Sequence, residues 1–163
     1  MDRFVSHFTN RLDAKGRVSV PAPFRAVMAR DGFEGIFVHP SLSSPSLDGG
    51  GNALLAEIET VLATLPAYSE ERDHLSTALF GISEILKVDG EGRIALSDTA
   101  KAHAGLSDQV TFVGLGHKFQ IWEPTRFGTH LAVARERVRD IRRELGGGEE
   151  KTRPSDRPGA RER

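Results

Sequence analysis

Hydrophobic and polar residues alternate along some stretches of the chain, which predicts strands, and recur at helical spacing along others, which predicts helices. Two short strands around a turn are expected within residues 4–20, followed by a helix over 24–30 with Pro23 at its first position. Residues 35–39 are apolar and predict a third strand. The stretch 40–51 is rich in Ser, Pro and Gly, and it therefore predicts a loop.

Two amphipathic helices are predicted in the middle of the chain. Asn52 is placed to cap the first helix, and Pro66 is placed to end it. Ser69 is placed to cap the second, with acidic residues in its first turn, where the helix dipole favours them. The apolar stripes of the two helices are Leu54, Ile58, Val61, Leu62 and Leu65, and Leu75, Leu79 and Ile82. Such stripes are more typical of a core or a subunit contact than of a cofactor site.

The pattern of the first segment returns from residue 84 onward. The predicted elements are strands over 85–88 and 93–96, a short helix over 98–104 capped by Ser97, strands over 110–113 and 119–122, and a helix over 124–145. The apolar stripe of the last helix is Phe127, Leu131, Ala134, Val138, Ile141 and Leu145. Residues 146–163 lack apolar anchors, and we expect this tail to be disordered and dispensable for folding.

The chain contains an internal repeat at an offset of 76 residues. RLDAKGRVSVPAPFRA at 11–26 aligns with KVDGEGRIALSDTAKA at 87–102, and an Asp, a Gly, an Arg and an Ala are identical between the copies. Two copies are too few for a solenoid. They suggest instead a pseudo-two-fold module in which each half completes the sheet of the other.

The unit shared by both copies is D-x-x-G-R. Its Asp can accept hydrogen bonds from the backbone of a turn, its Gly permits a left-handed step, and its Arg leaves the turn on the second strand. For a single copy, a hairpin with an Asp–Arg ion pair is a sufficient explanation. Repetition, with further basic residues around the first copy, favours an anion-binding surface, because arginine can bind a phosphate or two acceptors of guanine. The turn-forming residues are Asp13, Gly16, Asp89 and Gly92, and the candidate DNA contacts are Arg11, Lys15, Arg17, Arg25 and Arg93.

The segments RLDAKGRVSVPAPFR and VDGEGRIAL, followed by AGL, FVG and KFQIW at the expected distances, resemble the MraZ family. The resemblance covers residues 3–145. It implies an α+β, β-rich fold in which two SpoVT/AbrB-like halves form a pseudo-two-fold swapped-hairpin barrel with flanking helices. The expected organisation is a first half over 1–51, a helical pair over 52–82, a second half with the C-terminal helix over 83–145, and the tail over 146–163.

The resemblance also implies a function. It predicts a repressor that binds double-stranded DNA at promoter direct repeats of the division and cell-wall gene cluster, as a ring-shaped homo-oligomer in the cytoplasm and nucleoid. Two departures from the family pattern bear on this expectation. Glu91 stands where the first copy has Lys15, and the loop SLSSPSLDGGGN replaces an apolar strand, which is expected to be shortened or lost. We therefore expect the first copy to dominate DNA binding.

Composition narrows the alternatives. The 163 residues include no Cys, which excludes disulfides and Cys-ligated zinc and suits a reducing cytosol. No apolar run approaches the length of a membrane span, and the first residues lack the apolar segment of a signal peptide. Residues 1–30 carry six basic and two acidic side chains. Residues 31–84, in contrast, carry one basic and nine acidic side chains. The N-terminal block could therefore meet a polyanion although the net charge is −1.

No catalytic or metal-binding set is evident, and we expect neither enzyme activity nor a cofactor. The six His residues are scattered without ligand spacing. Arginines and acids alternate over 135–144, which is typical of a solvated helix face, with a subunit interface or a DNA flank as the alternative. Two other classes of protein stay open: an antitoxin-like regulator that holds a protein partner through its tail, and an oligomeric scaffold that binds no DNA.

Overall fold

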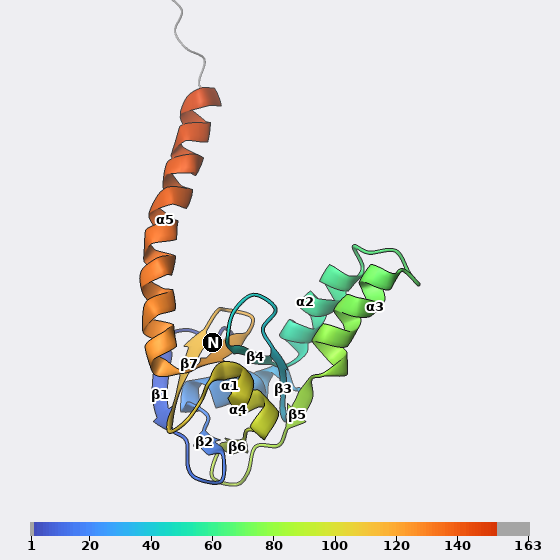
Figure 1. Ribbon diagram of the computed structural model, residues 1–163, viewed down its shortest axis with the longest axis vertical. Helices are drawn as coiled ribbons and strands as arrows, with labels where there is room; N and C mark the ends of the chain where they lie inside the picture. Colours follow the sequence, from blue (N-terminus) through green and yellow to red (C-terminus); the bar gives the residue numbers. More distant parts are fainter. Residues whose placement is uncertain (1, 153–163) are drawn as a thin grey trace, which may run out of the picture. The chain divides into compact units, whose positions relative to one another are not determined.

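The structure, a computed structural model, describes residues 2–152 in two units that divide between Thr125 and Arg126. The first unit contains all the strands of the described chain and every helix except the last (Figure 1). The helix α5 spans Pro124–Thr152, and all of it from Arg126 onward belongs to the second unit. The candidate site residues all belong to the first unit.

The larger sheet of the first unit has six strands, and every neighbouring pair is antiparallel. The strand order is β1 (His7–Arg11), β7 (Gln109–Gly114), β8 (Phe119–Trp122), β4 (Leu47–Gly50), β3 (Ile36–Pro40) and β5 (Glu84–Leu86). The expected α+β class is thereby confirmed. The sheet is open, with β1 and β5 at its two edges, so closure into a barrel stays a prediction.

A second, two-stranded sheet joins the two copies of the repeat. The strands β2 (Arg17–Ser19) and β6 (Arg93–Ala95) pair in antiparallel register around Val18 and Ile94, which occupy equivalent places in the two copies. Both of these side chains are 1% exposed. One strand of this sheet comes from each copy, and a local two-fold relation between the copies follows. The exchange of whole hairpins between the halves stays a prediction.

A short helix follows each of these two strands. The helix α1 (Ala22–Asp31) starts with Pro23 in its first turn and ends at Gly32, whose φ of 83° only glycine adopts without strain. The helix α4 (Asp98–Ala104) is capped by Ser97, whose hydroxyl accepts the N–H of Ala100. Both helices were expected. The apolar face of α1 enters the main core, where the ring of Phe24 packs against Phe4, Phe8, Phe112 and Phe119.

The stretch expected to be a loop over 40–51 contains a central strand instead. Residues Leu47–Gly50 form β4, which pairs with β3 on one side and β8 on the other, and all four residues are buried. The reason is close packing, because a Cβ on Gly49 would lie 2.7 Å from Cζ of Phe119. In the sequence these glycines favour a loop, but in the fold the absence of a Cβ at Gly49 lets the ring of Phe119 lie directly on the backbone of β4.

Helices α2 (Asn52–Leu62) and α3 (Glu70–Ser76), with the π-helical turn η1 (Thr77–Gly81), enclose a second apolar cluster with β3. Its buried residues are Phe37, Leu54, Ile58, Leu62 and Leu79. Ser69 caps α3 as expected, and its hydroxyl accepts the N–H of Arg72. Two expected core residues are exposed, Val61 and Ile82. For Ile82, the i→i+5 bond from its N–H to the carbonyl of Thr77 changes the helical register.

The helix α5 continues to Thr152, beyond the expected end at residue 145. Three consecutive glycines from Gly146 made an earlier end plausible, but extending an existing helix costs only about 1 kcal/mol per glycine relative to alanine. The expected disordered tail therefore does not begin at 146, and its part over 153–163 lies outside the described residues. Within the part of the chain that the structure describes, no helix is long and apolar enough to cross a membrane.

Candidate nucleic-acid interface

The first turn of the repeat is organised by one carboxylate. Oδ1 of Asp13 accepts the backbone N–H groups of Lys15 and Arg17 at 2.9 and 2.8 Å, and Oδ2 accepts Nε–H of Arg17 at 2.8 Å. The N–H of Gly16 donates to the carbonyl of Asp13, and Gly16 has a φ of 79°. Asp13 thus fixes both the turn and the direction in which the Arg17 guanidinium leaves it, as the D-x-x-G-R motif predicted.

The second turn repeats this geometry bond for bond. Oδ1 of Asp89 accepts the N–H groups of Glu91 and Arg93 at 2.8 and 2.9 Å, and Oδ2 accepts Nε–H of Arg93 at 3.0 Å. Gly92 adopts a φ of 78°. The two copies therefore present one arginine each in the same orientation relative to their turns.

The hydrogen bonds of the turns also change the pKa of the carboxyl groups. The N–H of Arg17 lowers the pKa of Asp13 from its ordinary value of 3.8, and the N–H of Arg93 does the same for Asp89. The hydrogen bond that the Arg93 side chain donates to Asp89 in turn raises the pKa of Arg93.

The β2–β6 ribbon presents both arginines on its outer face. Side chains alternate along a strand, and Val18 and Ile94 point inward. The opposite face therefore carries Arg17 and Ser19 from β2 and Arg93 and Ala95 from β6, since Arg17 pairs with Ala95 and Ser19 with Arg93. Figure 1 shows β2 and β6 at one end of the first unit, with both turns beside them. The structure thus forms a two-stranded ribbon with two arginines directed outward.

The two arginines differ in their carboxylate partners. Arg17 forms an ion pair with Asp13, and no second carboxylate within the described chain pairs with it. Arg93 pairs with Asp89 and also, through Nη1, with Glu91 at 3.6 Å. The Nη edge of Arg17 is therefore the more available to an incoming anion.

Two basic residues of the repeat lie beside the turn of the other copy. The sequence places Arg25 among the basic residues around the first copy, but its guanidinium lies at the second turn, where a Cβ on Gly92 would be 2.7 Å from Nη1. Lys101, which the sequence did not single out as a contact, lies at the first turn, 3.3 Å from a Cβ on Gly16. The signal that could have found Lys101 is its alignment with Arg25 in the repeat. Arg11 is exposed at the end of β1, and Lys15 is exposed in the turn itself.

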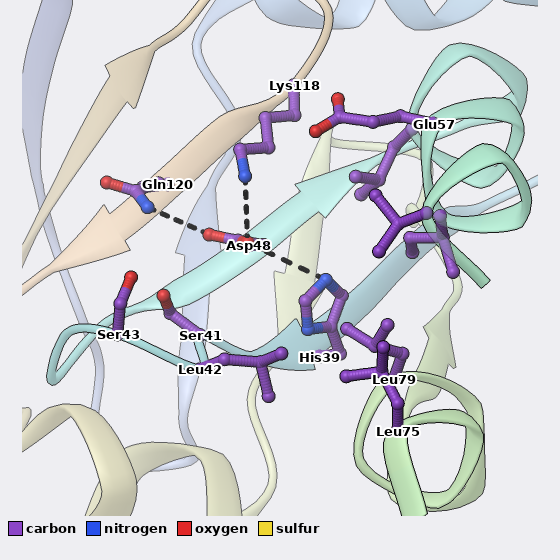
Figure 2. A pocket seen from close by; sticks show the side chains of 13 residues that line it. His39, Ser41, Leu42, Ser43, Asp48, Glu57, Leu75, Leu79, Lys118 and Gln120 are labelled. Carbon is purple, nitrogen blue, oxygen red and sulfur yellow. Dashed lines mark hydrogen bonds and ion pairs between the residues drawn. The ribbon is translucent and has the colours of Figure 1, made fainter. Parts of the chain in front are cut away.

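A cavity of about 210 Å³ lies elsewhere in the first unit and is lined by β3, β4, β8, α2 and the helical turn after α3. Figure 2 shows its polar wall, with the buried Asp48 at the centre. Asp48 accepts hydrogen bonds from Lys118 and Gln120 at 3.1 and 2.9 Å, and Nε2 of His39 lies 3.6 Å away. Nδ1 of His39 bonds the carbonyl of Pro40. These groups satisfy one another and tie β4 to its neighbours, so we interpret the network as structural.

The sequence of the chain is similar to those of proteins named as transcriptional regulators. Residues 79–144 match a family described as "MraZ protein, putative antitoxin-like". A protein of Beijerinckia indica named "Transcriptional regulator MraZ" is 66% identical over 89% of this chain and 88% of its own length. Proteins of the same name from Xanthobacter autotrophicus and Parvibaculum lavamentivorans are 59% and 43% identical, each over 94% of this chain and over 98% and 96% of their own lengths.

Proposed function

The chain belongs to the MraZ family of transcriptional regulators, and from this premise we propose that it is a sequence-specific DNA-binding repressor. The observation that carries the proposal is the β2–β6 ribbon with Arg17 and Arg93 on its outer face. A major groove admits a two-stranded ribbon, and an arginine there can bind O6 and N7 of guanine with two parallel hydrogen bonds.

The carboxylates of the turns support this role for the arginines. Each Asp holds the Nε edge of its arginine. At Arg17 this leaves the Nη edge to face DNA, whereas Nη1 of Arg93 also pairs with Glu91. Because the guanidinium is already oriented, less side-chain entropy is lost when a base or phosphate binds. The exposed Lys15 and Arg11 supply charge near the first turn for sequence-independent phosphate contacts. The asymmetry of carboxylates supports a larger contribution from the first turn than from the second.

We further propose that the protein acts as a closed homo-oligomer, a ring, on promoter direct repeats. The two halves, residues 1–51 and 83–145, each supply one turn, and so few basic residues should bind DNA weakly in a single copy. Several copies on repeated sites gain effective concentration without any new contact. The apolar stripe of α5 supports association, since Val138, Ile141 and Leu145 are 51%, 52% and 66% exposed in the single chain. The targets proposed are promoters of the division and cell-wall genes, including its own, so the protein would act at the nucleoid in the cytoplasm.

The direct test is binding to a duplex from upstream of its own gene, measured by fluorescence anisotropy against a duplex of the same composition in scrambled order. Preference for the upstream duplex, with footprints over direct repeats, is the expected result. Equal affinity for both duplexes would contradict sequence-specific repression, and absence of binding to either would contradict the DNA-binding role.

The description of the matching family also contains the term antitoxin-like, so an antitoxin-like regulator is the second candidate function. An antitoxin-like regulator would hold a protein partner tightly. Affinity purification of the tagged protein from its own cells separates the two roles: a stoichiometric small protein would favour the antitoxin role, and recovery of the chain with promoter DNA alone would favour the repressor.

A further inference from the structure

We propose that the DNA-binding site at each turn is composite, and that each half completes the site of the other with a cation from the helix after its strand. Lys101 would serve the first turn, beside Arg17, and Arg25 would serve the second, beside Arg93. The inference rests on the proposed DNA-binding function and specifies the residues that act together within it. It assigns Lys101 as a contact and moves Arg25 to the other site.

The antiparallel ribbon explains why the cations cross over. Where β2 begins, β6 ends, and the N–H of Leu96 donates to the carbonyl of Gly16 at 2.8 Å. At the other end, the N–H of Val20 donates to the carbonyl of Gly92 at 2.9 Å. Each strand therefore ends next to the turn of the other copy, and the helix that follows the strand begins there. The helix that carries Lys101 starts beside Gly16, and the helix that carries Arg25 starts beside Gly92.

The turn glycines accept this close approach. A Cβ on Gly16 would lie 2.9 Å from the carbonyl oxygen of Leu96 and 3.3 Å from Nζ of Lys101. A Cβ on Gly92 would lie 2.7 Å from Nη1 and 2.9 Å from Cζ of Arg25. Both glycines also adopt a positive φ. Because glycine has no Cβ, each of these residues can adopt the positive φ of the turn, and it also leaves room for the cation beside the backbone.

The two cations stay available to an anion in solution. Lys101 forms an ion pair at 3.3 Å with Asp98, whose side chain is fully exposed, so water competes strongly for that pair. Arg25 donates Nε–H to the carbonyl of Val20 at 3.2 Å, which orients the guanidinium and leaves its Nη groups toward the turn. DNA at the first turn would therefore meet the Nη edge of Arg17 and the ammonium of Lys101 together.

Double-mutant cycles on DNA affinity test the pairing, with the upstream duplex as probe. Arg17→Ala, Arg25→Ala, Arg93→Ala and Lys101→Ala are combined in pairs, and circular dichroism confirms folding. Two groups in one binding site are not independent, so the pairs Arg17 with Lys101 and Arg93 with Arg25 should each depart from the product of the single effects by about threefold or more. The pairs within one copy, Arg17 with Arg25 and Arg93 with Lys101, should be closer to independent.

Arg30→Ala is the matched control, because Arg30 lies on the same helix as Arg25 but pairs with Asp2 instead. It should leave affinity nearly unchanged, and Lys101→Arg should retain most of the affinity that Lys101→Ala loses. Stronger coupling within each copy than across the copies, or independence of all four pairs in a protein that binds DNA, would overturn the composite site alone. Wild-type protein that binds no duplex would overturn the proposed function, and this inference with it.

Discussion

The carboxylate of Asp31 caps a helix that begins at Asn52, 21 residues later in the chain. Oδ2 of Asp31 accepts the N–H of Asn52 at 2.6 Å, and Oδ1 accepts the N–H of Ala53 at 3.1 Å. The side chain of Asn52 donates in return to the carbonyl of Asp31 at 3.0 Å. The end of α1 is thereby fastened to the start of α2, where a negative charge also favours the helix dipole.

Loss of this cap should lower the stability of the protein. Asp31→Ala leaves two N–H groups of α2 without a partner, and we expect the free energy of unfolding to fall by about 1 kcal/mol. Urea denaturation followed by circular dichroism measures the change. Asp2→Ala is the control, because Asp2 forms an exposed ion pair at 3.9 Å with Arg30, and its loss should change stability by less than about 0.5 kcal/mol. Equal losses from both variants would contradict the capping role.

The turn aspartates should make stability depend on pH at the acid end. Their pKa values are lowered in the folded state, so their contribution is present above the ordinary value of 3.8 and is lost as the pH falls through the folded value. Replacing Asp13 and Asp89 by Asn should therefore flatten the fall in urea midpoint between about pH 5 and about pH 2. A double variant whose midpoint falls as steeply as that of the wild type would refute this linkage.

Asp48 should be one of the residues most costly to remove. It is 5% exposed and bonds Lys118 and Gln120, with His39 close by. Asp48→Ala would leave the partly buried ammonium of Lys118 and the amide of Gln120 without their acceptor, and we expect a loss of about 1 to 3 kcal/mol in the free energy of unfolding. Asp48→Asn should cost less, because it can still accept one of these bonds. A loss below about 1 kcal/mol for Asp48→Ala, at the level of an average substitution, would show that the network carries little energy.

The two turns should contribute unequally to DNA affinity. Arg17→Ala removes the arginine without a second carboxylate, and we expect at least a tenfold loss, since a bidentate base contact is worth about 1–3 kcal/mol. Arg93→Ala should reduce DNA affinity by less, because Glu91 already neutralises part of the charge of Arg93. Lys15→Ala should reduce the slope of log affinity against log salt by about 0.9. Equal losses for Arg17→Ala and Arg93→Ala in folded protein would remove the basis for the asymmetry.

The exposed stripe of α5 should support self-association. Ile141→Glu places a charge in the middle of this stripe without touching the core of the first unit, so we expect an unchanged melting temperature and a smaller mass in light scattering at micromolar concentration. Arg139→Glu, which adds the same side chain outside the stripe, is the matched control. A wild-type protein that is monomeric at that concentration and still binds DNA with full affinity would contradict the oligomeric mode of action.

Local structure follows closely from local sequence in this protein. The D-x-x-G-R turns, the caps at Ser69 and Ser97, and the helix end at Gly32 were all predictable, because each depends on hydrogen bonds or a φ angle within a few residues. The repeat itself indicated that the two halves would form equivalent turns and strands. The boundaries of α1 and α4 were likewise predicted to within about two residues.

What the tertiary structure alone decided are the contacts between distant segments. The glycines of β4 predict a loop from the sequence, but in the fold Gly49 packs against the ring of Phe119 in a central strand. The sequence likewise predicts Asn52 as the cap of α2, whereas the side chain of Asp31 caps this helix. The exchange of Arg25 and Lys101 between the turns follows from the antiparallel pairing of β2 with β6. Sequence by itself determined which residues make a turn, a cap or an exposed cation, because those depend on neighbours along the chain. Only the fold determined which cation reaches which turn, because that depends on the register in which segments about 76 residues apart align.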